Sequence, residues 1–119
     1  MPTVSTDRTQ MVMVFQNLIG NAIKYHGKEP PHVRIDARET EQNWQISVAD
    51  NGMGFDQGNA TQIFEPFRRL HGSGVPGSGI GLATCKRVIE RLGGTIWAES
   101  VMGAGSTFYF TIPNAAAEG

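Results

Sequence analysis

The sequence has one cysteine, no long apolar run and almost no net charge, and each shortage excludes a class of protein. Cys85 alone cannot form an internal disulfide, which fits a reducing compartment, and is expected to be a small core residue. No apolar run approaches bilayer-spanning length and no signal-peptide pattern opens the chain, so we expect a cytoplasmic domain without direct membrane contact. A net charge of −1, with basic residues scattered, predicts no nucleic-acid surface, so any phosphate binding has to be local.

Familiar catalytic and nucleotide-binding signatures are also missing. No nucleophile–base grouping or metal-ligating cluster stands out, and His26, His32 and His71 occur in unrelated contexts. The Walker A pattern is absent. Residues 72–77 match the dinucleotide-binding fingerprint by letter, but they follow no expected strand and contain a proline. A nucleotide site in this chain would therefore have another architecture.

What is present is a regular succession of helix, hairpin, loop, helix and hairpin. With 119 residues, 39% hydrophobic and 18% charged, the chain suits one soluble domain. We expect that domain over residues 1–113 and a frayed tail over residues 114–119. Periodicity and turn signals predict helices over residues 7–25 and 79–92, and strands over residues 32–39, 44–50, 95–100 and 106–112. This order predicts an α+β two-layer sandwich, with helices on one face of a mixed, largely antiparallel sheet.

The first helix carries an unusual polar face. Its predicted N-cap is Asp7. Its apolar stripe comprises Met11, Phe15, Leu18, Ile19, Ala22 and Ile23. Asn17, Asn21 and Lys24 fall on the other side, although asparagine is a poor helix former. An amide oxygen suits Mg²⁺ and a lysine can neutralise phosphate, so the face is either a binding surface or a chance polar one.

Asp50 ends the first hairpin on its apolar side. Alternation predicts a half-buried first strand with Val33, Ile35 and Ala37 inward, and a second strand with Trp44, Ile46 and Val48 inward. Asp50 continues that inward set, and a carboxylate there is costly unless hydrogen-bond donors reach it. It could accept from an adenine amino group or from local N–H groups of an Asx turn, and both interpretations stay open. Gly52 and Gly54 then form a tight turn.

A second glycine-rich stretch leads into the second helix. Residues 71–78 are expected to be a mobile loop, and Gly77-Ser78-Gly79-Ile80-Gly81-Leu82 follows with free amides at a helix start, which favours phosphate binding. Tyr25 could stack on a base or lie in the core. Arg68 and Arg69 could reach a phosphate or simply be solvated.

Five segments, in this order, resemble the ATP-binding catalytic domain of sensor histidine kinases, in the GHKL superfamily with the Bergerat nucleotide-binding fold. They are residues 17–25 (N box), 50–55 (first glycine box), 63–67 (F box), 77–82 (second glycine box) and 103–108 (the closing Gly-x-Gly-Ser-Thr-Phe segment). The resemblance covers about residues 2–113. One box alone is weakly specific, but five in register are a strong match.

The resemblance implies a role for individual residues. Asn21 would ligate Mg²⁺, Asn17 would line the same pocket, and Lys24 would contact phosphate. Around adenine it implies Tyr25, Asp50, Gly52, Met53, Gly54, Phe55 and Thr107, and around the phosphates and lid it implies Arg68, Gly77, Ser78, Gly79, Ile80, Gly81 and Leu82. Strand alternation places Thr107 opposite Phe108 and gives its role no independent support.

The implied activity is positioning of Mg-ATP for γ-phosphoryl transfer to a histidine on a separate dimerisation and phosphoacceptor domain, with a response regulator as an indirect partner. ATP-hydrolysing relatives carry a glutamate where this chain has Asn17, which cannot accept a proton from water, so slow hydrolysis is expected. No histidine here has a phosphoacceptor context, so the isolated domain should be monomeric and barely phosphorylate itself. Two alternatives stay open: a non-catalytic nucleotide-binding docking module, and a serine kinase of the anti-sigma type.

Overall fold

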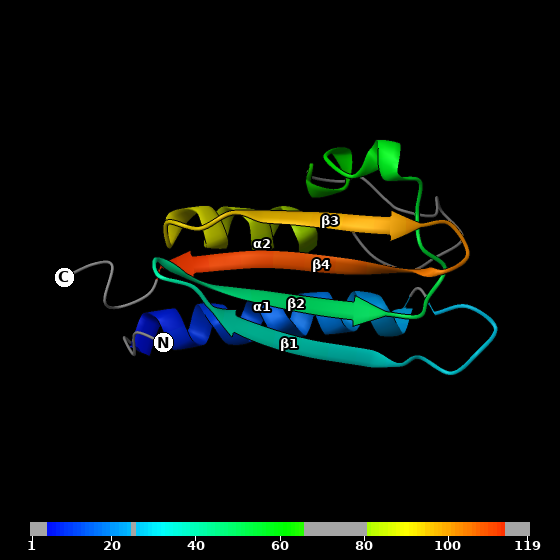
Figure 1. Cartoon of the computed structure of the whole chain (residues 1–119), viewed down its shortest axis with the longest axis horizontal. Helices are drawn as coiled ribbons and strands as arrows, with labels where there is room; N and C mark the ends of the chain where they lie inside the picture. The colour runs from blue at the N-terminus through cyan, green and yellow to red at the C-terminus, as the bar shows by residue number, and fades with distance from the viewer. Residues whose placement is uncertain (1–4, 25, 66–80, 114–119) are drawn as a thin grey trace.

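In the part of the chain that the structure describes, four strands form one antiparallel sheet and two α-helices cover one of its faces (Figure 1). The computed structural model describes residues 5–24, 26–65 and 81–113, with side chains from residue 9 onward. The elements are α1 (Ser5–Lys24), β1 (Val33–Glu39), β2 (Asn43–Asp50), the short 3₁₀ turns η1 (Gln57–Asn59) and η2 (Gln62–Phe64), α2 (Gly81–Arg91), β3 (Ile96–Val101) and β4 (Gly105–Pro113). The predicted α+β two-layer sandwich is confirmed, and every described strand pairing is antiparallel.

The two hairpins join through β2 and β4, and the core lies between these central strands and the helices. The strand order is β1-β2-β4-β3. The inward residues of β4 are Phe108, Phe110 and Ile112, as alternation predicted, and all three are buried. Phe110 makes an edge-to-face contact with Phe15 of α1, with ring centroids 5.6 Å apart. The sequence period therefore located the inner face of this hairpin correctly.

Helix α1 departs from the prediction at its start and in its buried stripe. It begins at Ser5, so Asp7 lies inside the helix and is not its N-cap. Val14 is fully buried, whereas Ile23, predicted to be inward, is 52% exposed. The buried arc is Met11, Val14, Leu18 and Ala22. Ile23 lies about 100° further round the helix than Ala22, beyond the surface that faces the sheet.

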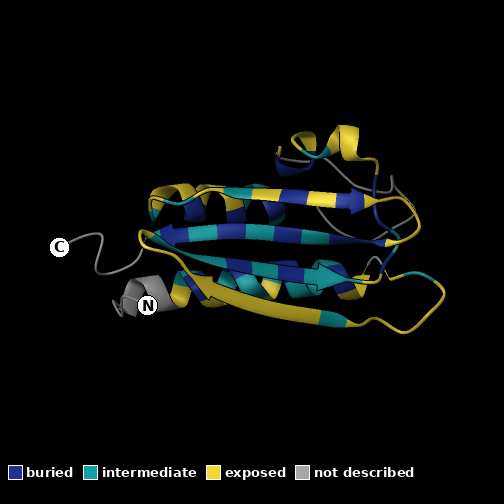
Figure 2. Cartoon of the chain, viewed as in Figure 1, coloured by how far each residue is buried: buried dark blue, intermediate teal, exposed yellow. Residues whose placement is uncertain are grey.

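Strand β1 was predicted to be half-buried, and this is wrong. Val33 is partly covered, but the rest of the strand is exposed, with Ile35 at 46% (Figure 2). The strand forms the edge of the sheet, while α1 packs against β2 and α2. Alternation records which residues share a face, but it does not say whether that face is covered.

Helix α2 ends where expected. The amides of Gly93 and Gly94 donate to the carbonyls of Glu90 and Ile89 at 3.0 and 2.9 Å, which closes the last turn as in a Schellman motif. The predicted start at Gly79, the loop over residues 71–78 and the tail over residues 114–119 lie outside the described residues. Within the described residues, no helix combines the length and apolarity needed to cross a bilayer.

Candidate functional site

The candidate site is at the end of the sheet where β2 finishes and β4 begins. Asp50, the last residue of β2, is paired with Ser106. Its Oδ1 accepts hydrogen bonds from the amides of Gly52 at 2.8 Å and Ser106 at 3.3 Å. Within the described residues, Oδ2 accepts none. The Asx-turn contact is thus present, and it orients a carboxylate whose second oxygen accepts no hydrogen bond from the described part of the chain.

The half-buried position of Asp50 affects its ionisation. Burial raises the pKa of this carboxyl above its ordinary value of 3.8, while the amide hydrogen bonds from Gly52 and Ser106 oppose that rise. An acceptor with raised proton affinity is suited to a hydrogen-bond donor such as an exocyclic amino group.

Two glycines let the segments around Asp50 approach one another. Gly54 has φ of 68° and a Cβ there would overlap the carbonyl oxygen of Val101. Gly105 has φ of 119° and a Cβ there would overlap the carbonyl oxygen of Asp50. Side chains at these positions would be strained and would also push the two turns apart. We call residues 50–55 and 101–106 the sheet-end wall.

A buried serine pair, missed by the sequence reasoning, ties this wall together. Ser100 Oγ accepts from the Phe55 amide at 2.8 Å and donates to the Gly105 carbonyl at 2.9 Å. Because its proton is used, Ser106 Oγ at 2.9 Å acts as the donor to Ser100 Oγ. The available signal was alternation in β3, which places Ser100 on the inner face after Ile96 and Ala98.

The second part of the predicted site is on α1, whose Asn17, Asn21 and Lys24 we call the helix wall. Asn17 Nδ2 donates to the Met13 carbonyl at 2.9 Å. A Cβ built on Gly81 would lie 2.6 Å from Asn17 Oδ1, so the amide oxygen faces the start of α2. Asn21 is half-buried and Lys24 exposed, and within the described residues neither side chain makes a hydrogen bond. The N box and the second glycine box therefore meet.

The remaining predicted site residues are placed differently. Phe55 and Leu82 are buried in the core, so their side chains contribute packing, and the Phe55 amide is already bonded. Thr107 pairs with Ala49 on the outer face of the sheet, away from Asp50, while the neighbouring Ser106 faces inward. The positions outside the described residues are Tyr25, Arg68, Gly77, Ser78, Gly79 and Ile80.

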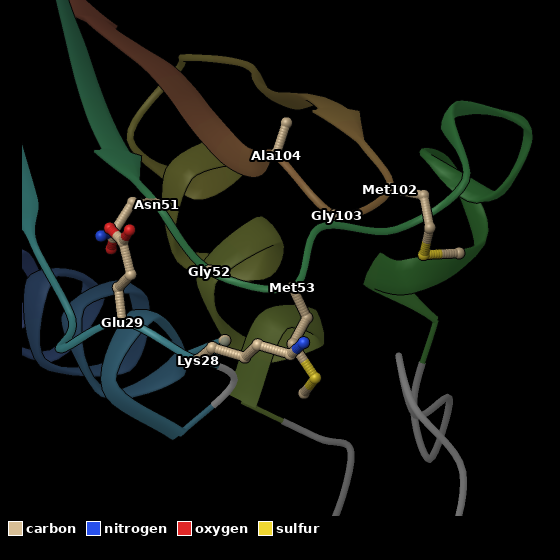
Figure 3. Close-up of a pocket in the computed structure, with 9 residues that line it drawn as sticks. Lys28, Glu29, Asn51, Gly52, Met53, Met102, Gly103 and Ala104 are labelled. Atoms are coloured by element: carbon tan, nitrogen blue, oxygen red, sulfur yellow. The ribbon is translucent and has the colours of Figure 1, made fainter.

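A pocket of about 630 Å³ adjoins the glycine turn (Figure 3). It is lined by residues 27–29, 51–53 and 102–104. In Figure 3 the Lys28 side chain points toward Met53, and the Glu29 side chain points toward Asn51. Gly52 and Met53 belong to the predicted nucleotide site, so this pocket is continuous with the first glycine box.

Residues 6–116 match the family described as histidine kinase-, DNA gyrase B- and HSP90-like ATPase. The chain belongs to this family. It is 49% identical over 114 residues to cyanobacterial phytochrome A from Nostoc sp., covering 95% of this chain and 15% of that protein. The catalytic domain of histidine kinase ThkA superposes with a TM-score of 0.74 at 32% identity, covering 89% of this chain and 68% of that one.

Full-length ShkA, solved in complex with AMPPNP, superposes with a TM-score of 0.76 at 30% identity, covering 87% of this chain and 21% of that one. Together these likenesses identify an ATP-binding catalytic domain of the histidine-kinase type with the GHKL fold. The chain spans about 15% of the length of the phytochrome relative. It therefore corresponds to one domain of that protein.

Proposed function

We propose that this chain positions Mg-ATP for transfer of the γ-phosphoryl group to a histidine on a separate dimerisation and phosphoacceptor domain. The observation that carries this proposal is the Asp50 carboxylate, which two backbone amides orient through one oxygen, while the other accepts no hydrogen bond from the described residues. It is supported by the position of the Asn17 amide oxygen, which faces the start of α2 at Gly81.

Asp50 would bind the base, with Oδ2 accepting from the adenine amino group. The turn at Gly52 and Gly54 lets the backbone approach a planar ring. At the other end, the start of α2 supplies amides and a positive helix dipole for phosphate, and Lys24 supplies a mobile positive charge. These groups orient the substrate and neutralise its charge, which is the main protein contribution to phosphoryl transfer.

The described side chains could hold Mg²⁺ only if a bound nucleotide supplied further oxygen ligands. The described residues contain no cluster of three or more His, Cys, Asp or Glu that could hold a metal. The Asn21 amide oxygen could supply one hard ligand, and Mg²⁺ is commonly bound by one or two protein oxygens plus substrate phosphates. We therefore expect Mg²⁺ to bind weakly alone and to be taken up with ATP, where it would offset phosphate charge.

Asn17 is the residue that favours phosphoryl transfer over ATP hydrolysis. Its amide cannot act as a general base, and its Nδ2 is already donating to Met13. Water attack should therefore be slow, which leaves the γ-phosphoryl group for an acceptor side chain. Lysine and backbone amides near the phosphates would stabilise charge in either reaction, so the acceptor decides the outcome.

Calorimetric titration with ADP and ATP, with and without Mg²⁺, tests the binding step. Asp50→Ala should weaken nucleotide binding about 10- to 100-fold, because a charge-assisted hydrogen bond contributes about 1.5–3 kcal/mol. Asp36→Ala is the matched control, since Asp36 is exposed on β1 and paired with Arg34. Equal affinity in the wild-type chain and Asp50→Ala would refute the base-binding role.

Transfer is tested by mixing the chain and labelled ATP with a histidine-containing dimerisation and phosphoacceptor domain from a related kinase. Label should appear on the acceptor and remain nearly absent from the chain itself. A serine-containing antagonist serves as the second acceptor. Label on serine alone would favour the anti-sigma type of kinase, and label on neither, despite nucleotide binding, would favour a docking module.

A further inference from the structure

Segment 26–32 joins the helix wall to the sheet. It lies between the end of α1 at Lys24 and the start of β1 at Val33, and its Gly27, Lys28 and Glu29 line the pocket. Pro30 and Pro31 lack backbone N–H groups, so this part of the segment has few donors for pairing with the sheet. Its placement therefore depends on side chains from elsewhere.

Asn51 supplies those contacts with both ends of its amide. Its Oδ1 accepts from the His32 amide at 2.8 Å, and its Nδ2 donates to the Pro30 carbonyl at 3.2 Å. The amide thus bonds the residues on both sides of Pro31, in the way that a peptide group of a neighbouring strand would. The β1–β2 ladder ends at the pair Val33 and Asp50, so the Asn51 side chain extends that ladder by one further step.

Within the described residues, few other hydrogen bonds reach the segment. Among the described residues, the only other side-chain hydrogen bond within the segment is local, from His26 Nδ1 to the Gly27 carbonyl at 2.8 Å. Gly27 packs beside Gly52, since a Cβ on Gly27 would lie 4.0 Å from the Gly52 carbonyl carbon. The segment therefore rests on the glycine turn and is fastened there by Asn51.

We propose that Asn51 is a positioning residue for nucleotide binding: its side-chain amide holds segment 26–32 against the glycine turn and so fixes the C-terminal end of α1 relative to Asp50. Asn21 and Lys24 are on that end of α1, and Asp50 immediately precedes Asn51 in the sequence. The Asn51 side chain thereby adds to the core packing of α1 in setting the spacing between the helix wall and the sheet-end wall. This inference rests on the proposed function, because it concerns how the same nucleotide site is assembled.

Asn51→Ala and Asn51→Asp test the clamp in the whole 119-residue chain. Alanine removes both contacts, whereas aspartate keeps an acceptor for the His32 amide and loses the donor to Pro30. Asn59→Ala is the matched control, because Asn59 is exposed in η1. The measurements are hydrogen exchange of the His32 amide by NMR, the Kd for ADP by calorimetry and the thermal midpoint.

We expect Asn51→Ala to lose His32 protection without nucleotide and to raise the Kd for ADP about tenfold, as when a tenth of the molecules keep the competent arrangement. Asn51→Asp should keep His32 protection and show an intermediate Kd. Asn59→Ala should match the wild type in both. A purely structural residue would lower the thermal midpoint and leave the Kd unchanged.

Two results would overturn the proposal: His32 protection that persists in Asn51→Ala, or loss of that protection with wild-type affinity for ADP. Failure of the proposed function is separable from both. If the wild-type chain bound no ADP, the nucleotide site itself would be refuted, and with it the role of Asn51 in binding. His32 exchange in Asn51→Ala would then still report whether the clamp exists.

Discussion

The sheet-end wall and the helix wall are the two parts of the proposed nucleotide site, and they are held in different ways. In the sheet-end wall, backbone amides donate between segments: the Ser106 amide donates to the Asp50 carboxylate at 3.3 Å, and the Gly103 amide donates to the Met53 carbonyl at 2.7 Å. The helix wall has one described side-chain hydrogen bond, from Asn17 to its own helix. Within the described residues, the Asn21 and Lys24 side chains make none.

This difference separates stability from binding. Changes at Ser100 and at the glycines of the sheet-end wall should cost folding free energy, because these residues hold closely packed turns that cannot relax independently. Changes in the helix wall should cost affinity, because its polar atoms remain available for a ligand. Asp50 belongs to the sheet-end wall but is also proposed to bind the base. Its charge should therefore favour nucleotide binding while its partial burial lowers the folding stability.

The largest loss of stability is expected from Gly105→Ala. The new Cβ would overlap the Asp50 carbonyl at a φ of 119°, and we expect a loss of about 3–5 kcal/mol, measured by urea unfolding. Gly103→Ala is the matched control, since Gly103 has φ of 83° but open space around its Cβ position. It should lose only about 1–2 kcal/mol. Equal losses would mean that close approach to Asp50 is unimportant.

Ser100→Ala should have the next largest effect. It leaves the buried Phe55 amide without its acceptor, which costs about 1–3 kcal/mol. Ser47→Ala on the outer face of β2 should change the unfolding free energy by less than about 0.5 kcal/mol. Chemical denaturation of both variants checks this, and a Ser100→Ala chain as stable as Ser47→Ala would contradict the role given to the serine pair.

In contrast to the two preceding variants, Gly81→Ala should weaken nucleotide binding more than it lowers the folding stability. Its Cβ would lie 2.6 Å from Asn17 Oδ1, and the amide can turn away at little cost in stability. We expect the Kd for ADP to rise about tenfold, equivalent to about 1.4 kcal/mol, with little change in the thermal midpoint. Gly20→Ala, where the new Cβ meets nothing within 4 Å, is the control.

A double-mutant cycle sharpens this prediction. If Gly81→Ala acts through the Asn17 amide, it should cause no further loss of affinity in an Asn17→Ala chain. Additive losses would show that Gly81 contributes by another route, for example through its own amide.

The smallest effect expected is the pH dependence of Asp50→Asn. The folded-state pKa of Asp50 is raised above 3.8, so its favourable contribution is complete below the unfolded pKa and lost as pH rises through the folded pKa. At pH 7 the asparagine variant should therefore melt at a higher temperature than the wild type. Thermal melts should show this difference in melting temperature shrinking below pH 3.8. A difference that grows on acidification would mean that the Asp50 charge stabilises the fold, contrary to this prediction.

Sequence alternation located Asp50 correctly because the side-chain period of a strand is fixed by its backbone. The same rule put Thr107 opposite Phe108, and the structure places Thr107 on the outer face. Alternation failed for β1, because exposure at an edge depends on what covers the strand. In α1, helical periodicity placed Ile23 in the buried stripe and left Val14 out, which was wrong, because docking on the sheet decides which apolar arc is buried.

The residues that assemble the site were harder to predict than those that line it. Ser100 and Ser106 meet only because β3 and β4 pair in that register. Asn51 reaches His32 and Pro30 across 19 and 21 residues of sequence. Contacts of this kind depend on cross-strand register and on the path of a loop, neither of which leaves a local pattern.

By itself, the sequence determined the family, the order of the elements, the inward direction of Asp50 and the polar side of α1. Each follows from short-range backbone periodicity and from the residue types that nucleotide chemistry requires. The tertiary structure alone decided which apolar faces are covered, which oxygen of Asp50 accepts the backbone hydrogen bonds, and which residues Asn51 bonds. Those features arise from packing and hydrogen bonds between segments distant in the chain, where the free energy depends on geometry that no local stretch encodes.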